Sequence, residues 1–286
     1  MYYRELARKF GVSEGTIRNR FDHMRSTGLL TGSIVHPNPC LLGVMMGAYG
    51  LEVSQALPKA DVVNKLKLVG GVLVIQNHHG NFVGIVFLYE DDRLLKKKLA
   101  LFRSIAGAEG GIFSRMRFPP CNVSLTSADW ELVAQLAKGE FRSYKELAKE
   151  MKIPFRSLNR ELSRVVGGGA VFTIPRLDYS AMKGAVPADV MVLFKTAEAR
   201  EAAETKILEL IDDFMFYAGI WTDQGLYSLI LPNALIASEL TRKVAQIGGV
   251  EMVRTELVDD HIDQPEIFEY YIARQMTLLR GSQRRR

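Results

Sequence analysis

The sequence predicts an α+β protein in which two winged helix–turn–helix domains alternate with two ferredoxin-like domains. Three observations support this prediction. The segment YRELARKF at residues 3–10 returns as YKELAKEM at residues 144–151. Each copy precedes a basic helical pattern with one apolar face, and each is then followed by a βαββαβ pattern. Internal similarity at about half the chain length indicates two like units.

The composition is that of a globular protein. Its 286 residues are 48% hydrophobic with a net charge of +5, and the pI of about 9.1 is compatible with an acidic partner. No apolar run reaches the roughly 18 residues of a membrane span, and the first residues do not resemble a secretory signal. We therefore expect a cytoplasmic protein without a membrane partner. Cys40 and Cys121 lack partners at metal-site or disulfide spacing, which predicts structural thiols, no metal site and no cofactor.

Residues 3–26 have the pattern of a helix–turn–helix motif. Leu6, Ala7 and Phe10 share one helical face, Gly11 breaks the helix, and Ser13 is placed to cap the next one. Residues 29–37 then give a short apolar pattern with turn residues, which predicts a hairpin-like wing. This order of elements is typical of a DNA-binding module.

The second helix of this motif has an inward and an outward side. Ile17, Phe21 and Met24 recur at helical spacing and are predicted to be buried, which leaves Arg18 and Asn19 exposed near the helix start. Arginine suits guanine edges and asparagine suits adenine edges in the major groove. Arg18 and Asn19 are therefore predicted to contact base edges in double-stranded DNA.

The second copy differs from the first in two places, the segment that precedes it and the residue that begins its second helix. Residues 126–137 read as a capped amphipathic helix that has no equivalent before the first motif, so the first unit is expected to lack its opening helix. Pro154 stands where Ser13 caps the first copy, and proline is accepted in a first helical turn. The second unit is thus open to two interpretations, a second DNA reader or a structural module. Its predicted base-edge residues are Arg156, Asn159 and Arg160.

The remaining basic residues of the two motifs are predicted to neutralise phosphates without reading sequence. They are Arg4, Arg8, Lys9, Arg25, Lys145 and Lys149.

Two stretches alternate between strand and helix patterns in the order βαββαβ, which is typical of ferredoxin-like domains. The first comprises strands at 44–53, 72–76, 82–89 and 112–118 with helices at 59–69 and 91–106, and the second comprises strands at 190–195, 216–221, 226–231 and 251–258 with helices at 198–212 and 234–247. Such a sheet carries both helices on one face, so the two copies are expected to cover each other's free faces.

The predicted domains are residues 1–43 (first winged helix–turn–helix), 44–120 (first ferredoxin-like domain), 121–184 (second winged helix–turn–helix), 185–260 (second ferredoxin-like domain) and 261–286 (a terminal helix and a basic tail). The tail is expected to add nonspecific phosphate contacts.

These features together resemble the Lrp/AsnC, or leucine-responsive, family of regulators. The resemblance covers nearly all of residues 3–258 and rests on the segment YRELA, Val12-Ser13, Ile17, the Gly28-Leu29-Leu30 turn and the βαββαβ order. It implies a DNA reader joined to a sheet domain that binds a small-molecule effector and forms oligomers. Members commonly have an acidic residue near the central hairpin turn, and both copies here lack it. The turn residues that the resemblance implies for effector binding are Asn77, His78, His79, Thr222, Asp223 and Gln224.

Two alternatives to a regulator remain at this point. The siroheme decarboxylases resemble the family in their two-domain plan and work as paired, unlike halves, and His78-His79 is the nearest match to a proton-transferring group. A protein that joins other regulators through its sheets, with or without further homo-oligomerisation, is the other alternative. No catalytic constellation or motif is found, so we expect a DNA-binding regulator that is not an enzyme and has no catalytic residues.

Overall fold

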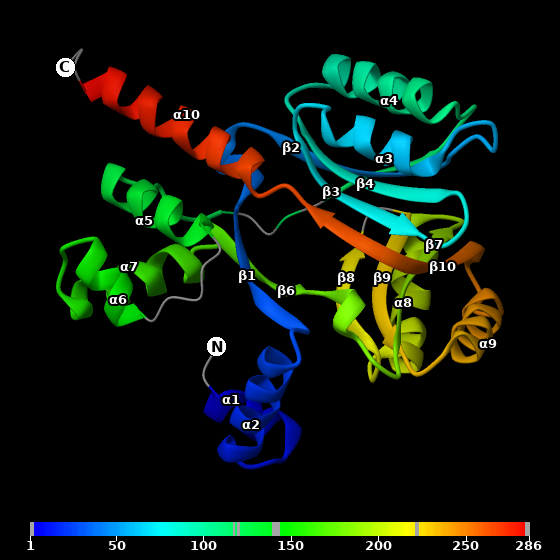
Figure 1. Cartoon of the computed structure of the whole chain (residues 1–286), viewed down its shortest axis with the longest axis horizontal. Coiled ribbons are helices and arrows are strands. Elements are labelled where there is room, and N and C mark those ends of the chain that lie inside the picture. Colours follow the sequence, from blue (N-terminus) through cyan, green and yellow to red (C-terminus); the bar gives the residue numbers. More distant parts are fainter. Residues whose placement is uncertain (1–2, 117, 119–120, 139–143, 221–222, 284–286) are drawn as a thin grey trace.

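The computed structural model describes residues 3–116, 118, 121–138, 144–220 and 223–283, and Figure 1 labels its elements. The first half contains α1 (Tyr3–Phe10), α2 (Glu14–Ser26), β1 (Leu30–Pro37), the 3-10 helix η1 (Pro39–Leu42), β2 (Met45–Glu52), α3 (Lys59–Lys67), β3 (Val72–His78), β4 (Phe82–Tyr89), α4 (Asp92–Ala106) and β5 (Ile112–Arg115). The second half contains α5 (Ser127–Ala137), α6 (Tyr144–Glu150), α7 (Phe155–Gly167), β6 (Val171–Leu177), η2 (Tyr179–Ala181), β7 (Val186–Phe194), α8 (Ala197–Ile211), β8 (Met215–Ile220), β9 (Gln224–Leu231), α9 (Ala234–Ala245), β10 (Val250–Asp263) and α10 (Glu266–Gln283). The chain is therefore a mixed α/β protein.

The predicted βαββαβ order is present in both halves, but the strands do not form two separate sheets. They form one sheet in the order β5-β2-β4-β3-β10-β7-β9-β8. Strand β10 joins the halves because it runs to Asp263 rather than ending at the predicted Val258. Its first part pairs with β7, and its last part pairs antiparallel with β3.

Each half of the sheet has one face covered by helices. The apolar side chains of β2, β3 and β4 that include Ile75 and Phe87 pack under α3 and α4, and those of β7 and β9 pack under α8 and α9. Because side chains alternate along a strand, the residues between them point to the opposite, helix-free face. The two helix-free faces turn toward one another in the middle of the molecule (Figure 1).

The segment that was expected to form a wing does not fold back on itself. Residues 30–37 form the single strand β1, which pairs antiparallel with β6 from the second half, so that Val35 lies opposite Thr173. The expected hairpin was wrong because the turn-forming residues Gly32 and Ser33 stay within the strand, where Gly32 pairs with Arg176. The resulting two-stranded ribbon links the α1–α2 unit to the rest of the molecule (Figure 1).

The terminal helix α10 packs into a core to which both halves contribute. Phe268, Tyr271 and Ile272 of α10 are buried in the same cluster as Trp130 of α5 and Leu158 of α7. The terminal helix expected within residues 261–286 is present as α10. This helix includes residues 281–283, where the basic tail was expected to begin, and residues 284–286 of that tail lie outside the described residues. In α1 and α2, by contrast, the buried residues are Ala7 and Ile17.

None of the described helices combines the length and apolar character that a membrane span needs. Cys40 and Cys121 are free thiols. Although they come from different segments, they are neighbours, and burial together with the adjacent Cys121 raises the pKa of the Cys40 thiol.

Candidate functional site

Helix α2 begins as the sequence pattern predicts. Gly11 provides the turn with a φ of 63°, a conformation that favours glycine. The Ser13 side chain accepts a hydrogen bond from the backbone N–H of Thr16 at 3.0 Å and so caps the helix. Ile17 is 4% exposed, and the neighbouring Arg18 and Asn19 are exposed. The first turns of α2 therefore present an arginine and an asparagine to solvent.

The charged side chains of α2 interact along the helix surface. Arg18 lies 3.6 Å from Glu14 and 5.1 Å from the centroid of the Tyr3 ring, and Arg25 lies 3.5 Å from Asp22. Exposed pairs of this kind contribute about 0–1 kcal/mol. The Glu14 carboxylate and the Tyr3 ring thus orient the Arg18 guanidinium, and breaking these contacts would cost little free energy.

Helix α7 begins directly after Pro154, which occupies the N-cap position and provides no side-chain hydrogen bond to the helix. Its inward face buries Leu158, Leu162 and Val165. The predicted base-edge residues of this unit, Arg156, Asn159 and Arg160, are exposed. So are the phosphate candidates elsewhere in the two motifs: Arg4, Arg8, Lys9, Arg25, Lys145 and Lys149.

One arginine of α7 forms an ion pair with a buried carboxylate. Arg164 is paired with the carboxylate of Asp129, whose side chain is 1% exposed. Thr126 donates to the same carboxylate from its backbone N–H and its hydroxyl, both at 2.7 Å. Burial opposes ionisation of Asp129, but the hydrogen bonds from Arg164 and Thr126 outweigh it and hold its pKa below the ordinary value. This pair fastens α7 to α5.

A cavity of about 60 Å³ lies between the two helix-free faces of the sheet. Two of the predicted effector residues, His78 and Gln224, line it. Asn77 and Asp223 are not part of its lining, and His79 is 77% exposed beside Asp259. Thr222 lies outside the described residues.

The interpretation of His78 as a polar turn residue was wrong. It is the last residue of β3, it is 2% exposed, and its Nε2 lies 2.8 Å from Asp189 Oδ2 on β7. Gln224 was also expected in a turn and is the first residue of β9. Both strands extend beyond their predicted ends because the added residues pair with an adjacent strand: His78 pairs with Val258 of β10, and Gln224 pairs with Leu193 of β7.

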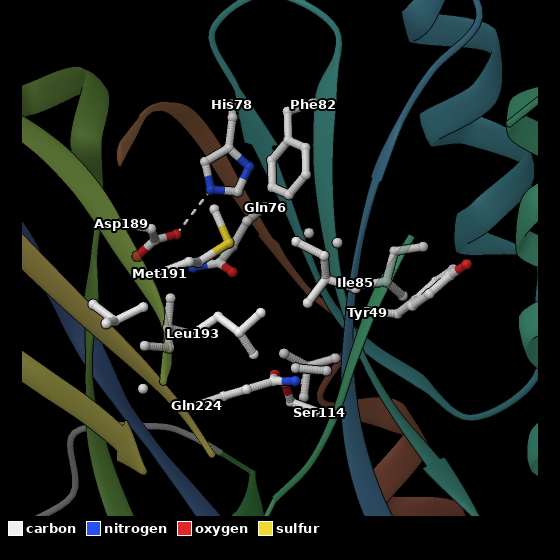
Figure 2. A pocket seen from close by; sticks show the side chains of 18 of the residues that line it. Tyr49, Gln76, His78, Phe82, Ile85, Ser114, Asp189, Met191, Leu193 and Gln224 are labelled. Atoms are coloured by element: carbon white, nitrogen blue, oxygen red, sulfur yellow. Dashed lines mark hydrogen bonds and ion pairs between the residues drawn. The ribbon is translucent and has the colours of Figure 1, made fainter. Parts of the chain in front are cut away.

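The cavity has polar ends and apolar walls. Figure 2 shows His78 and Asp189 pointing toward one another at one end, Gln224 and Ser114 at the other, and Met191 among the side chains between them. Ser228 donates to Asp189 Oδ1 at 2.5 Å, so both carboxylate oxygens have partners. The Nδ1 atom of His78 is buried with no partner among the described residues.

Sequence reasoning missed Asp189, Gln76, Ser114 and Ser228. Asp189 carried a usable signal, because it interrupts the apolar strand VPADVMVLF, and a carboxylate inside such a strand is rarely buried without a partner. Gln76, Ser114 and Ser228 carried no signal of this kind, since single polar residues at alternate positions are also typical of a solvated strand face.

The end of β10 connects the sheet to the β1–β6 ribbon. Gln76, which lines the cavity, pairs directly with His261 of β10. His261 Nε2 lies 2.9 Å from Asp263, which in turn lies 3.8 Å from Arg176 of β6. Burial lowers the pKa of the nearby His36 of β1 to about 4, against the opposing influence of Asp263. A continuous set of contacts therefore leads from the cavity to the ribbon.

Two regulatory proteins are similar to parts of the chain. It is 30% identical over 100 residues to the HTH-type transcriptional regulator Ptr1 of Methanocaldococcus jannaschii, a match that covers 34% of this chain and 67% of that protein. It is 36% identical over 66 residues to the regulatory protein AsnC of Escherichia coli strain K12, which covers 23% of this chain and less than half of AsnC, namely 43%. No protein-family model matches the chain.

A solved structure is similar over nearly the whole length. The siroheme decarboxylase NirDL superposes with a TM-score of 0.54 over 97% of this chain and 93% of its own, at 16% identity. It has also been solved with an iron-uroporphyrin III analogue. This finding corrects the expectation that the chain is not an enzyme. The fold that the sequence suggested for a regulator is also, over nearly the full length, the fold of an enzyme. At this identity the similarity establishes the fold alone.

Proposed function

The chain belongs to the Lrp/AsnC family, and from that premise we propose that it is a transcriptional regulator that binds duplex DNA through α2. The observation that carries the proposal is the capped, basic start of α2, where Arg18 and Asn19 are exposed beside the buried Ile17. The start of a recognition helix is the part that enters the major groove in helix–turn–helix proteins.

The basic residues have two roles in this proposal. Arg18 and Asn19 contact base edges, with Arg156, Asn159 and Arg160 as the corresponding set on α7. The phosphate contacts come from Arg4, Arg8, Lys9, Arg25, Lys145 and Lys149.

The two halves act as a dimer within one chain. The support is their equivalent βαββαβ order and the antiparallel pairing of β1 with β6, which places equivalent segments of the two halves side by side. In this proposal the domains are those that the sequence predicts, except that the β1–β6 ribbon takes the place of the wings and β10 extends the second ferredoxin-like domain to Asp263. They arose by duplication. A small-molecule effector in the cavity would act on the DNA-binding units through β10 and the ribbon.

The proposal is tested by DNA retention. The purified chain is incubated with fragmented genomic DNA across a salt series, and we expect retention of a few fragments with strong salt dependence. On a retained fragment, Arg18→Ala should reduce the preference over bulk DNA by about 10–100-fold. Lys9→Ala should weaken all fragments equally and lower the salt slope by about 1.

The two variants control for each other, because both remove one exposed positive charge from the same motif. Equal losses on every fragment would refute base reading by Arg18. Retention of no fragment at any salt concentration would refute the regulator proposal itself.

A second candidate function is the decarboxylation of a tetrapyrrole, which the full-length fold similarity to siroheme decarboxylase NirDL favours together with the exposed His79, which follows the buried His78. Decarboxylation replaces a carboxylate with a proton, and a histidine can supply that proton. The test is to incubate the chain with siroheme and follow the loss of CO2 by mass spectrometry, with His79→Ala as the control. Unchanged siroheme would refute this candidate.

A further inference from the structure

The two cysteines of the chain, which the proposed function does not use, meet where β1 ends and β6 begins. Cys40 is exposed on the 3-10 helix η1, and Cys121 is half-buried in the segment before α5. The backbone N–H and the side chain of Cys121 are both in hydrogen-bonding contact with the Cys40 thiol. The whole first ferredoxin-like domain separates the two residues in the sequence, so the fold brings the two sulfur atoms together.

Backbone contacts that involve no sulfur atom hold the two cysteines near each other. Asn38 donates to carbonyls of the segment 168–170 from its backbone N–H at 2.8 Å and from its side-chain amide at 2.9 Å. Its Oδ1 accepts from the backbone N–H of Cys40 at 3.2 Å. Asn122, which follows Cys121, donates from its backbone N–H to the same segment at 3.0 Å. Both cysteines are therefore positioned by one short loop.

The two thiols differ in access. Cys40 is exposed, whereas Cys121 packs against the main apolar core and its S–H lies 3.5 Å from the carbonyl oxygen of Val123. An oxidant in solution therefore reaches Cys40 first, and Cys121 is the thiol next to it. The sequence holds no third cysteine, so a disulfide within one chain has a single possible pairing.

We propose that Cys40 and Cys121 are a redox modification site at which a low-molecular-weight disulfide oxidises the pair to a reversible disulfide. The Cys40 thiolate attacks one sulfur of the small disulfide, whose S–S bond breaks and releases one small thiolate. The Cys121 thiolate then attacks Cys40 Sγ, and the second small thiolate leaves. The two protein thiols lose two electrons and two protons, and the small disulfide gains both and becomes two thiols.

The bond would close residues 41–120 into a loop that contains every strand and helix from β2 to β5. A cross-link restricts the unfolded chain more than the folded chain, in which its two ends are already adjacent. The disulfide should therefore form at least tenfold more favourably in the folded chain, and by the same factor it should stabilise the fold, by about 1.4 kcal/mol or more. The inference does not depend on DNA binding, because neither cysteine lies in α2 or α7.

The test equilibrates the full chain with mixtures of glutathione and glutathione disulfide and then traps free thiols with N-ethylmaleimide for intact-mass measurement. It is run at pH 8.5, because the thiolate is the reacting form and burial raises the pKa of the Cys40 thiol. We expect a monomer that has lost two hydrogen atoms and takes up no maleimide, and dithiothreitol should restore two reactive thiols. Two alkylated cysteines at every ratio, a stable mixed disulfide with glutathione, or disulfide-linked dimers alone would each overturn the inference.

Single variants separate the roles of the two thiols. Cys121→Ser should stop at the mixed disulfide between glutathione and Cys40, and Cys40→Ser should react with glutathione disulfide at least tenfold more slowly than Cys121→Ser. Equal rates in the two variants would refute Cys40 as the thiol that is attacked first.

The same equilibration in concentrated urea measures what the fold contributes. The equilibrium constant for the protein disulfide should fall at least tenfold when the chain is unfolded, because the two cysteines are then joined only by a long flexible loop. Equal constants in buffer and in urea would mean that the fold does not place the thiols for bonding, and the inference would be wrong.

Discussion

The two helix–turn–helix units of this chain have similar sequences and very different packing. In the unit formed by α1 and α2, Ala7 and Ile17 are the buried residues of the helices, and Phe10 is 58% exposed. In the unit formed by α5, α6 and α7, Trp130 and Leu158 belong to a large core that α10 completes. The same motif is thus a projecting module in one half and part of the main core in the other.

The electrostatics differ in the same way. Arg18 of α2 is engaged in an exposed pair with Glu14, whereas Arg164 of α7 holds the buried Asp129. Ser13 caps α2 through its side chain, and Pro154 precedes α7 without such a bond. If the chain binds DNA as proposed, the comparison favours α2 as the main reader and α7 as a helix that mainly stabilises the fold.

Removing a buried side chain should have the largest effect, and its extent should differ between the units. Leu158→Ala creates a cavity in the main core, where Leu158 is fully buried, and should lower the free energy of unfolding by about 3 kcal/mol. Ile17→Ala should loosen α1 and α2 locally and leave the main transition nearly unchanged, because few buried residues depend on it. Urea unfolding measures the first effect, and hydrogen exchange in α2 measures the second.

The control is the far-ultraviolet circular dichroism of both variants in buffer. A main transition that shifts equally in the two variants would contradict the comparison, because it would mean that α1 and α2 are part of the same cooperative core.

Paired arginine variants should separate the two units in DNA binding. Arg18→Ala should cost about 1–3 kcal/mol on a specific site. Arg160→Ala should cost only a few tenths of the free energy lost in Arg18→Ala, because we expect α7 to contribute less than α2 to base reading. Fluorescence anisotropy on a retained fragment and on a scrambled one measures both, and a larger specific loss for Arg160→Ala would reverse the assignment of the main reader.

The pair between α7 and α5 should contribute to stability in a pH-dependent way. The Arg164 side chain is 42% exposed, so solvent screens the pair and Arg164→Ala should lower the free energy of unfolding by only about 1–2 kcal/mol. The pKa of Asp129 is held below its ordinary value of 3.8. A carboxylate with a lowered pKa contributes stability that is full above the ordinary value and is lost as the pH falls through the lowered one.

Wild type and Arg164→Ala should therefore differ most near neutral pH and converge as the pH falls from about 3.8 through the lowered pKa of Asp129. Thermal unfolding across this range gives the measurement, and Arg164→Lys, which keeps the charge, should recover part of the difference at pH 7. A difference that stays constant down to low pH would show that Arg164 acts through packing alone.

The order of helices and strands was predictable because it depends on local periodicity. The helix expected at 91–106, for example, is present as α4, and in the structure Asp91 caps it by accepting from the backbone N–H of Leu94 at 2.7 Å. The ribbon was not predictable, since Leu30 finds its partner at Leu177 and nothing near Leu30 specifies that pairing. The extension of β10 was missed for the same reason, because its last residues are held by β3 from the other half.

The candidate site shows the same contrast between features set by the local sequence, which could be predicted, and features set by distant residues, which could not. Exposure of Arg18 and Asn19 could be predicted from helical spacing, because their neighbour Ile17 is the buried one. The burial of His78 could not be predicted. His78-His79-Gly80 is typical of a polar turn, and the carboxylate that pairs with His78 in the interior belongs to Asp189 in the other half of the chain.

The smallest expected effect concerns the helix caps. Pro154→Ser restores the residue type that caps α2, and a serine side chain at this position can accept from the backbone N–H two or three residues later. The substitution should raise the free energy of unfolding by about 0.5–1 kcal/mol, and Ser13→Ala should lower the stability of α2 by a similar amount without moving the main transition. If the missing cap is what limits α7 as a reader, Pro154→Ser should also strengthen binding to a specific DNA site. Stabilisation without a change in DNA affinity would instead mean that α7 is limited by its packing against α5, which is the division of roles that the comparison of the two units predicts.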